Sequence, residues 1–138
     1  MKGRNLEEQM RLSLRAILSQ HMTSSKSGTE AHRILASFVS DESGFPLTGM
    51  RRSGNRIVDM EVDEFEQMSA LIPQIWEQCQ PSVQGLDFIS EEVEEGELNH
   101  LTIGFKKKEE ETPHLEVMVT RLDELFLSSI YYAKRKTL

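Results

Sequence analysis

The sequence predicts an α+β domain with a single five-stranded antiparallel sheet flanked by helices, in the order helix, two strands, helix, three strands, helix. Three observations predict it. Residues 63–79 repeat apolar side chains at helical spacing, residues 101–105 and 115–119 place them at every second position, and a turn at residues 41–44 joins two further apolar runs. A chain of 138 residues is long enough for one domain with a real core and too short for two.

The helix at residues 63–79 carries an apolar stripe that is wider than one sheet requires. Asp63 and Glu66 are spaced as in a capping box and mark its start. The stripe covers roughly 100° of a helical wheel, and Leu71 widens it to about 140°. This width favours two neighbours, a sheet beneath and a second surface beside it, such as the same helix of another subunit; a helix buried wholly in its own domain is the alternative. The stripe consists of Phe65, Met68, Leu71, Ile72, Ile75, Trp76 and Cys79.

Pro73 lies in the middle of this helix. It removes the N–H that would bond to the carbonyl of Ser69, and its ring crowds that carbonyl. Because the apolar spacing continues in phase beyond Pro73, we expect one bent helix rather than two separate ones.

The first half of the chain predicts a helix and a hairpin. Residues 1–22 form an amphipathic helix that ends near His21, and the Ser-rich residues 19–31 are interpreted as a flexible segment. Residues 32–40 form a strand covered on both faces, and the Asp-x-x-Gly turn returns the chain into a strand at residues 45–50. Pro46 and Gly49 place that second strand at the edge of the sheet, and Ile57 and Val58 can extend it.

The second half predicts three strands and a helix. Residues 86–93 form a strand, and residues 101–105 and 115–119 form a hairpin. Three apolar pairs fall into register together in that hairpin: Leu101 with Val119, Ile103 with Val117 and Phe105 with Leu115. A last helix begins near Leu122 or Asp123, because apolar residues recur at positions 122, 125, 126 and 130, and the basic residues 134–136 suit its carboxyl end.

Composition excludes several classes of protein. The formal net charge of −7 argues against a general nucleic-acid binder, whose affinity rests on Lys and Arg. Cys79 is the only cysteine, so no intrachain disulfide forms, and we expect a reducing, cytoplasmic setting. No apolar run reaches the ~18 residues of a membrane span, and the first residues lack the apolar core of a signal peptide. Direct insertion into a membrane is therefore not expected.

Motifs of catalysis and cofactor binding are missing from the sequence. It contains no phosphate-binding loop, no dinucleotide-binding glycine pattern and no nucleophile elbow. No two of the four histidines have the short spacing of zinc ligands. The acidic run at residues 91–97 and the three arginines Arg51, Arg52 and Arg56 are interpreted as solvated loop residues. We therefore expect no enzyme activity, no cofactor and no metal.

The order of elements carries a family resemblance over nearly the whole chain. The segments that carry it are RILASFVSDESGFPLTG for the first hairpin, DEFEQMSALIPQIWEQC for the central helix, and LTIGF with HLEVMV for the last hairpin. This pattern resembles the Roadblock family of dynein light chains and GTPase-regulator subunits. The resemblance implies a profilin-like sandwich, with the central helix on one face of the sheet and the terminal helices on the other. It also implies dimers formed through the central helices and the third strands, which adds Phe88 and Ile89 to the interface.

The resemblance implies a function as well. Roadblock proteins are non-catalytic adaptors or scaffolds, so we expect a homodimer or a pair with a paralogous Roadblock subunit that binds or regulates a Ras-like small GTPase or a trafficking or motor complex. One alternative is a small-molecule sensor of the PAS or GAF type, which needs a cavity between sheet and helix. Another is a longin-like trafficking domain, in which the helix at residues 6–18 would be an addition to the fold.

Overall fold

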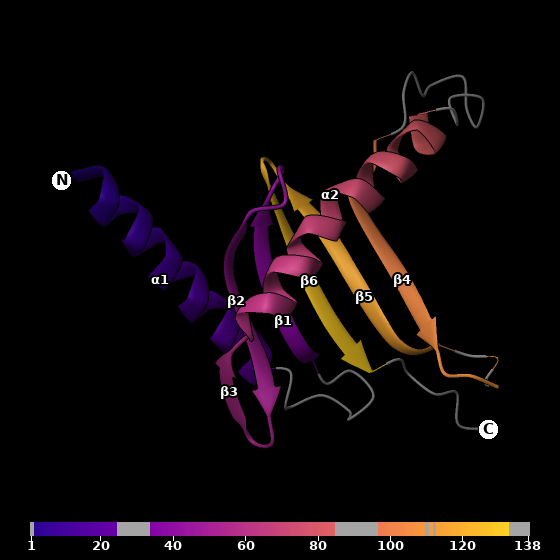
Figure 1. The fold of residues 1–138 in the computed structure, drawn as a ribbon, viewed down its shortest axis with the longest axis horizontal. Coiled ribbons are helices and arrows are strands. Elements are labelled where there is room, and N and C mark those ends of the chain that lie inside the picture. Colours follow the sequence, from indigo (N-terminus) through magenta and orange to yellow (C-terminus); the bar gives the residue numbers. More distant parts are fainter. Residues whose placement is uncertain (1, 25–33, 85–96, 110, 112, 133–138) are drawn as a thin grey trace.

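The computed structural model describes residues 2–24, 34–84, 97–109, 111 and 113–132. Its elements are α1 (Lys2–Ser24), β1 (Ile34–Asp41), β2 (Pro46–Ser53), β3 (Arg56–Asp59), α2 (Val62–Gln84), β4 (His100–Lys106), β5 (Pro113–Leu122) and β6 (Leu125–Tyr132). The strands form one antiparallel sheet in the order β3-β2-β1-β6-β5-β4 (Figure 1). The predicted α+β class is confirmed, but the sheet has six strands rather than five.

Each helix lies on its own face of the sheet, and each face has its own core. Ala36 and Phe38 of β1 pack with Ile72 and Trp76 of α2, whereas Val39, on the other parity of β1, belongs to the core beneath α1. Figure 1 shows α2 crossing the sheet diagonally, while α1 leads away from the β2–β3 edge. The core beneath α1 also contains Leu18, Met22, Ile34 and Met50.

The turn between β1 and β2 is held by the side chain of Asp41. Its Oδ1 accepts hydrogen bonds from the backbone N–H groups of Ser43 at 2.9 Å and Phe45 at 2.8 Å. Gly44 closes the turn at φ +87°, a conformation that favours glycine. The predicted Asp-x-x-Gly hairpin is therefore confirmed.

The hairpin of β4 and β5 has the predicted register. Leu101 pairs with Val119, Ile103 with Val117 and Phe105 with Leu115. The register shifts after Phe105, so that Lys106 pairs with Pro113.

The last predicted helix is wrong, because residues 125–132 form β6. Strand β6 lies between β1 and β5, so apolar residues occur on both of its faces and the two-residue alternation is blurred. Ser128, which is fully buried, adds to that blurring. Asp123 at φ +55° provides the tight turn from β5 into β6, and the helical spacing from position 122 to position 130 was coincidental.

The short strand β3 corrects the prediction that β2 is an edge strand. Gly54, at φ +62°, reverses the chain so that Arg56–Asp59 pairs with Met50–Ser53. Pro46 lies outside the stretch that pairs with β3, so no strand on that side needs its missing N–H.

Both helices are longer than predicted. Helix α1 continues to Ser24, past His21, and α2 runs unbroken through Pro73 and Pro81 to Gln84. The single central helix is thus confirmed. The predicted strand at residues 86–93, the remainder of the segment 19–31 and the basic residues 134–136 lie outside the described residues. Within the described residues, neither helix is long and apolar enough to cross a membrane.

Candidate functional site

Aromatic contacts at two points fix the side of α2 that faces the sheet. Trp76 is 2% exposed, and its ring centroid lies 5.2 Å from that of Phe126 on β6. Nearer the start of α2, Phe65 meets Phe38 of β1 edge-on at 6.0 Å. Because aromatic rings bury large areas in preferred orientations, these contacts restrict rotation of α2 about its axis.

One flank of α2 is covered by the β1–β2 turn. A Cβ atom at Gly44 would lie 3.1 Å from the Cα of Ala70, 3.2 Å from the carbonyl oxygen of Ser69 and 3.3 Å from the Cγ of Pro73. Only a glycine allows the turn to approach the helix so closely. At this point the turn meets the carbonyl of Ser69, which lacks its helical donor because Pro73 has no N–H.

The other flank of α2 is apolar and open. We call it the α2 flank; it consists of Met68, Leu71, Ile75 and Cys79. Leu71 is 52% exposed, and the other three side chains are half-buried. Helix α2 therefore presents more apolar surface than its own sheet covers.

Strand β4 is an edge of the sheet, and its apolar residues lie on the same face as α2. Leu101 and Ile103 pair with Val119 and Val117, which belong to the core beneath α2. Phe105 continues this row and is 51% exposed. In the described part of the chain no strand pairs with the outer side of β4. A free edge beside exposed apolar side chains is a surface suited to pairing with another chain.

The predicted interface residues divide into two groups. Phe65, Ile72 and Trp76 point into the chain's own core. The remaining four residues of the stripe form the α2 flank, and one of them, Met68, also packs against the edge of that core. Phe88 and Ile89 lie outside the described residues. Sequence reasoning missed Phe105 as a surface residue, because it took residues 86–93 to be the strand next to the partner. The signal that could have found it is a large aromatic residue beside a charged hairpin tip.

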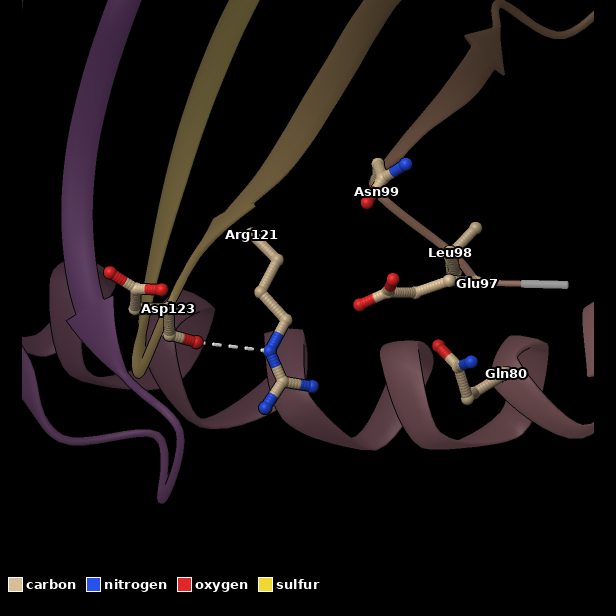
Figure 2. Close-up of a pocket in the computed structure, with 6 residues that line it drawn as sticks. All are labelled: Gln80, Glu97, Leu98, Asn99, Arg121 and Asp123. Carbon is tan, nitrogen blue, oxygen red and sulfur yellow. Dashed lines mark hydrogen bonds between the residues drawn. The ribbon is translucent and has the colours of Figure 1, made fainter. Parts of the chain in front are cut away.

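A polar pocket of about 570 Å³ lies between the second half of α2 and the start of β4 (Figure 2). Its lining residues are Gln80, Glu97, Leu98, Asn99, Arg121 and Asp123. The Arg121 Nε donates to the carbonyl of Asp123 at 3.1 Å, and the guanidinium lies 5.7 Å from the Phe126 ring centroid. Its Nη2 also lies 3.7 Å from a carboxylate oxygen of Glu42.

These contacts give Arg121 a structural role. They tie the β5–β6 turn to the β1–β2 turn, and two carboxylates and one guanidinium leave the pocket without a dominant charge. The pocket offers hydrogen-bond donors and acceptors but no strong preference for an anion or a cation. Among the described residues, no three His, Cys, Asp or Glu side chains come together as a metal site.

Comparison with known proteins finds similarity in structure only. No protein-family model matches the sequence, and no curated protein matches it. The gliding protein MglB from Thermus thermophilus is 9% identical and aligns with a TM-score of 0.56 over 86% of this chain and 70% of its own. MglB from Myxococcus xanthus is 12% identical and aligns with a TM-score of 0.52 over 87% of this chain and 76% of its own.

The chain has the Roadblock fold. A Roadblock/LC7 domain from Streptomyces avermitilis also matches, at 11% identity and a TM-score of 0.49, over 73% of this chain and 67% of its own. The two MglB structures confirm the family resemblance at the level of the fold. Since the Roadblock fold does not determine activity, the function rests on the surfaces of this chain.

Proposed function

We propose that this chain is a non-catalytic Roadblock adaptor that pairs through the α2 flank and the edge of β4. Its partner is a second copy or a paralogous subunit, and the pair binds or regulates a Ras-like small GTPase or a trafficking or motor complex. The observation that carries the proposal is the open α2 flank on the same face as the exposed apolar row of β4. A second α2 would cover both, while a second β4 would continue the sheet.

Two-fold symmetry makes such an interface self-complementary. Two β4 strands meeting about a two-fold axis pair antiparallel, which satisfies the backbone groups of both edges. The two α2 helices then lie side by side on one face of the continuous sheet. In this arrangement Leu71 and Phe105 of each copy lose their contact with water.

Burial of Leu71 and Phe105 contributes substantially to the free energy of pairing but is not sufficient alone to form a dimer. Burying a large apolar side chain contributes about 1.5–3 kcal/mol, so a half-exposed one contributes roughly 1 kcal/mol. Leu71 and Phe105 of two copies therefore contribute roughly 4 kcal/mol. A micromolar dimer needs about 8 kcal/mol, so the proposal also requires the rest of the α2 flank and the strand pairing.

The two alternative functions gain no support from the packing. A sensor needs a cavity between sheet and helix, but Trp76, Ile72 and Phe126 fill that layer. The polar pocket lies between the carboxyl-terminal half of α2 and the start of β4, beyond the stretch that these three side chains fill. A longin-like domain would treat the first helix as an addition, whereas Leu18 and Met22 of α1 are 2% and 0% exposed in the second core.

The pairing is tested by the solution mass of Leu71→Asp. The chain weighs 15.8 kDa, so light scattering separates one copy from two. We expect wild type to form pairs and Leu71→Asp to lose them, because a charge would be buried at the two-fold axis. Val62→Asp is the matched control: Val62 is 66% exposed on the same helix, nine residues away and so on the opposite side. If both variants remain paired, the α2 flank is not the interface.

The GTPase partner is tested separately with the same two variants. Small GTPases loaded with a non-hydrolysable GTP analogue are passed over immobilised wild type, Leu71→Asp and Val62→Asp. We expect wild type and Val62→Asp to retain a GTPase, and Leu71→Asp to lose it. Equal binding by all three would mean that the paired helices are not the platform.

A further inference from the structure

The polar pocket at the start of β4 contains the carboxylate of Glu97. This side chain is exposed, and Figure 2 shows its carboxylate turned into the pocket between Arg121 and Gln80. None of the residues that the structure describes forms an ion pair with Glu97. Arg121 instead contacts the carbonyl of Asp123 and the carboxylate of Glu42. The Glu97 carboxylate is therefore available to a cation from another chain.

The apolar row on the α2 face selects one register for two β4 strands. Leu101, Ile103 and Phe105 lie on that face. Directly opposed residues of an antiparallel pair lie on the same face, so the two-fold axis passes through a residue and not between two. Only an axis at Ile103 places all three opposite apolar residues, with Leu101 of one copy against Phe105 of the other. This register covers Phe105, which is 51% exposed in one copy.

The same register brings Lys107 of one copy to the pocket of the other. The β4 backbone continues back to Asn99, whose carbonyl accepts from the N–H of Arg121 at 3.0 Å. Lys107 follows Phe105 by two residues, and the register shift there adds a residue to β5 and not to β4, so Lys107 extends the row on the α2 face. It lies directly opposite Asn99 of the second copy and diagonal to Glu97, about 7–8 Å away, which a long side chain can span.

We propose that Lys107 of each copy enters the polar pocket of the other and forms an ion pair with Glu97. The contact occurs twice about the two-fold axis, and it rests on the proposed pairing through β4. The occupant is a second copy, because the exposed lysines at residues 106–108 and the exposed carboxylate of Glu97 lie at opposite ends of the same sheet edge. The carboxamide oxygens of Gln80 and Asn99 line the pocket and can accept further hydrogen bonds from the ammonium group. Opposite charges at the two ends of β4 thus favour the register that the apolar row selects.

Exchange of the two charges tests this contact. Glu97→Lys places two lysines at each contact, and Lys107→Glu places two carboxylates there. Each variant alone should pair roughly tenfold more weakly than wild type, because repulsion replaces attraction at both contacts. A mixed pair of the two variants joins a lysine to a glutamate at both contacts again. Sedimentation of labelled Glu97→Lys with unlabelled Lys107→Glu should therefore give an affinity within about threefold of wild type.

Lys106→Glu is the matched control for this experiment. It makes the same change of charge one residue away, but the alternation of β4 turns Lys106 to the opposite face of the sheet. We expect Lys106→Glu to pair with itself as wild type does and not to restore the pairing of Glu97→Lys. The contact is overturned if Lys107→Glu pairs with itself as well as Lys106→Glu does, or if Glu97→Lys binds both glutamate variants equally.

The variant Leu71→Asp separates failure of this contact from failure of the proposed function. If wild type pairs, Leu71→Asp does not, and all charge variants behave like wild type, the α2 pairing stands and the Lys107 contact is wrong. If wild type is monomeric at every concentration, both are wrong. If Leu71→Asp stays paired while Glu97→Lys and Lys107→Glu select each other, the contact stands and pairing through the α2 flank is wrong.

Discussion

Gly44→Ala should destabilise the fold by about 2–5 kcal/mol. An alanine at φ +87° adopts a left-handed conformation, which costs roughly 1–2 kcal/mol. Its Cβ would also lie 3.1 Å and 3.2 Å from backbone atoms of Ala70 and Ser69, closer than the 3.5–4.0 Å of favourable contact. Overpacking of this kind adds about 1–3 kcal/mol, because the turn must move away from α2. With a urea dependence of about 2 kcal/mol per molar, the unfolding midpoint falls by roughly 1–2.5 M.

Gly54→Ala is the matched control for this prediction. Gly54 is also left-handed, at φ +62°, but no atom lies within 4 Å of an added Cβ. Both substitutions reduce the conformational entropy of the unfolded chain to the same extent, so this stabilising contribution cancels when the two variants are compared. Gly54→Ala therefore measures the conformational cost alone, and we expect Gly44→Ala to lose about 1–3 kcal/mol more. Equal losses in urea unfolding would refute the close contact between the β1–β2 turn and α2.

Two further predictions concern the attachment of α1 to the sheet and the stability of the fold at alkaline pH. Arg52 donates from Nε to the carbonyl of Ile34 at 3.0 Å and from Nη2 to the carbonyl of Met22 at 2.8 Å. Arg52→Ala should therefore lower the free energy of unfolding in urea by about 3 kcal/mol. Arg52→Lys should recover at most part of that loss. An unchanged midpoint would contradict this role. Burial and the hydrogen bond to Glu116 raise the pKa of Tyr131 to about 12. Since the folded value exceeds the unfolded value of about 10, this contribution to stability is complete below pH 10 and is lost as pH rises towards 12. Tyr131→Phe should flatten the fall in stability across that window, and a phenolate absorbance titration of folded wild type should show one late-titrating tyrosine.

The parts of the fold that the sequence predicted well are those with a local physical signature. The turn of β1 and β2 depends on one Asp side chain and one left-handed glycine, both visible in the sequence. The register of β4 and β5 follows from apolar residues at every second position, since a slip by one residue would turn all of them to the other face.

The failures occurred where tertiary position overrides the local pattern. Strand β6 is central, so both of its faces are covered and its alternation is lost; Phe126 and Ile130 then matched a helical period by chance. Strand β3 is only four residues long and is defined by its pairing with β2 rather than by its own composition. Arg52 was interpreted as a solvated loop residue, because its two acceptors are distant in sequence.

The candidate site was predicted in outline and missed in detail. The width of the apolar arc indicated a second neighbour for the central helix, and the open position of Leu71 is the structural basis of the proposal that followed from it. A helical wheel cannot show which part of the stripe the chain's own sheet covers. Packing assigns Ile72 and Trp76 to the core, and it is the covering of the opposite flank by the Gly44 turn that leaves Leu71 exposed.

The Gly44 contact therefore links stability to assembly. By seating α2 against the β1–β2 turn, it sets the rotation of the helix and so the direction in which Leu71 points. A variant that moves the turn changes the α2 flank without touching any of its residues. Because residues in contact act non-additively, a variant that shifts α2 should weaken pairing through the flank in addition to lowering the free energy of unfolding.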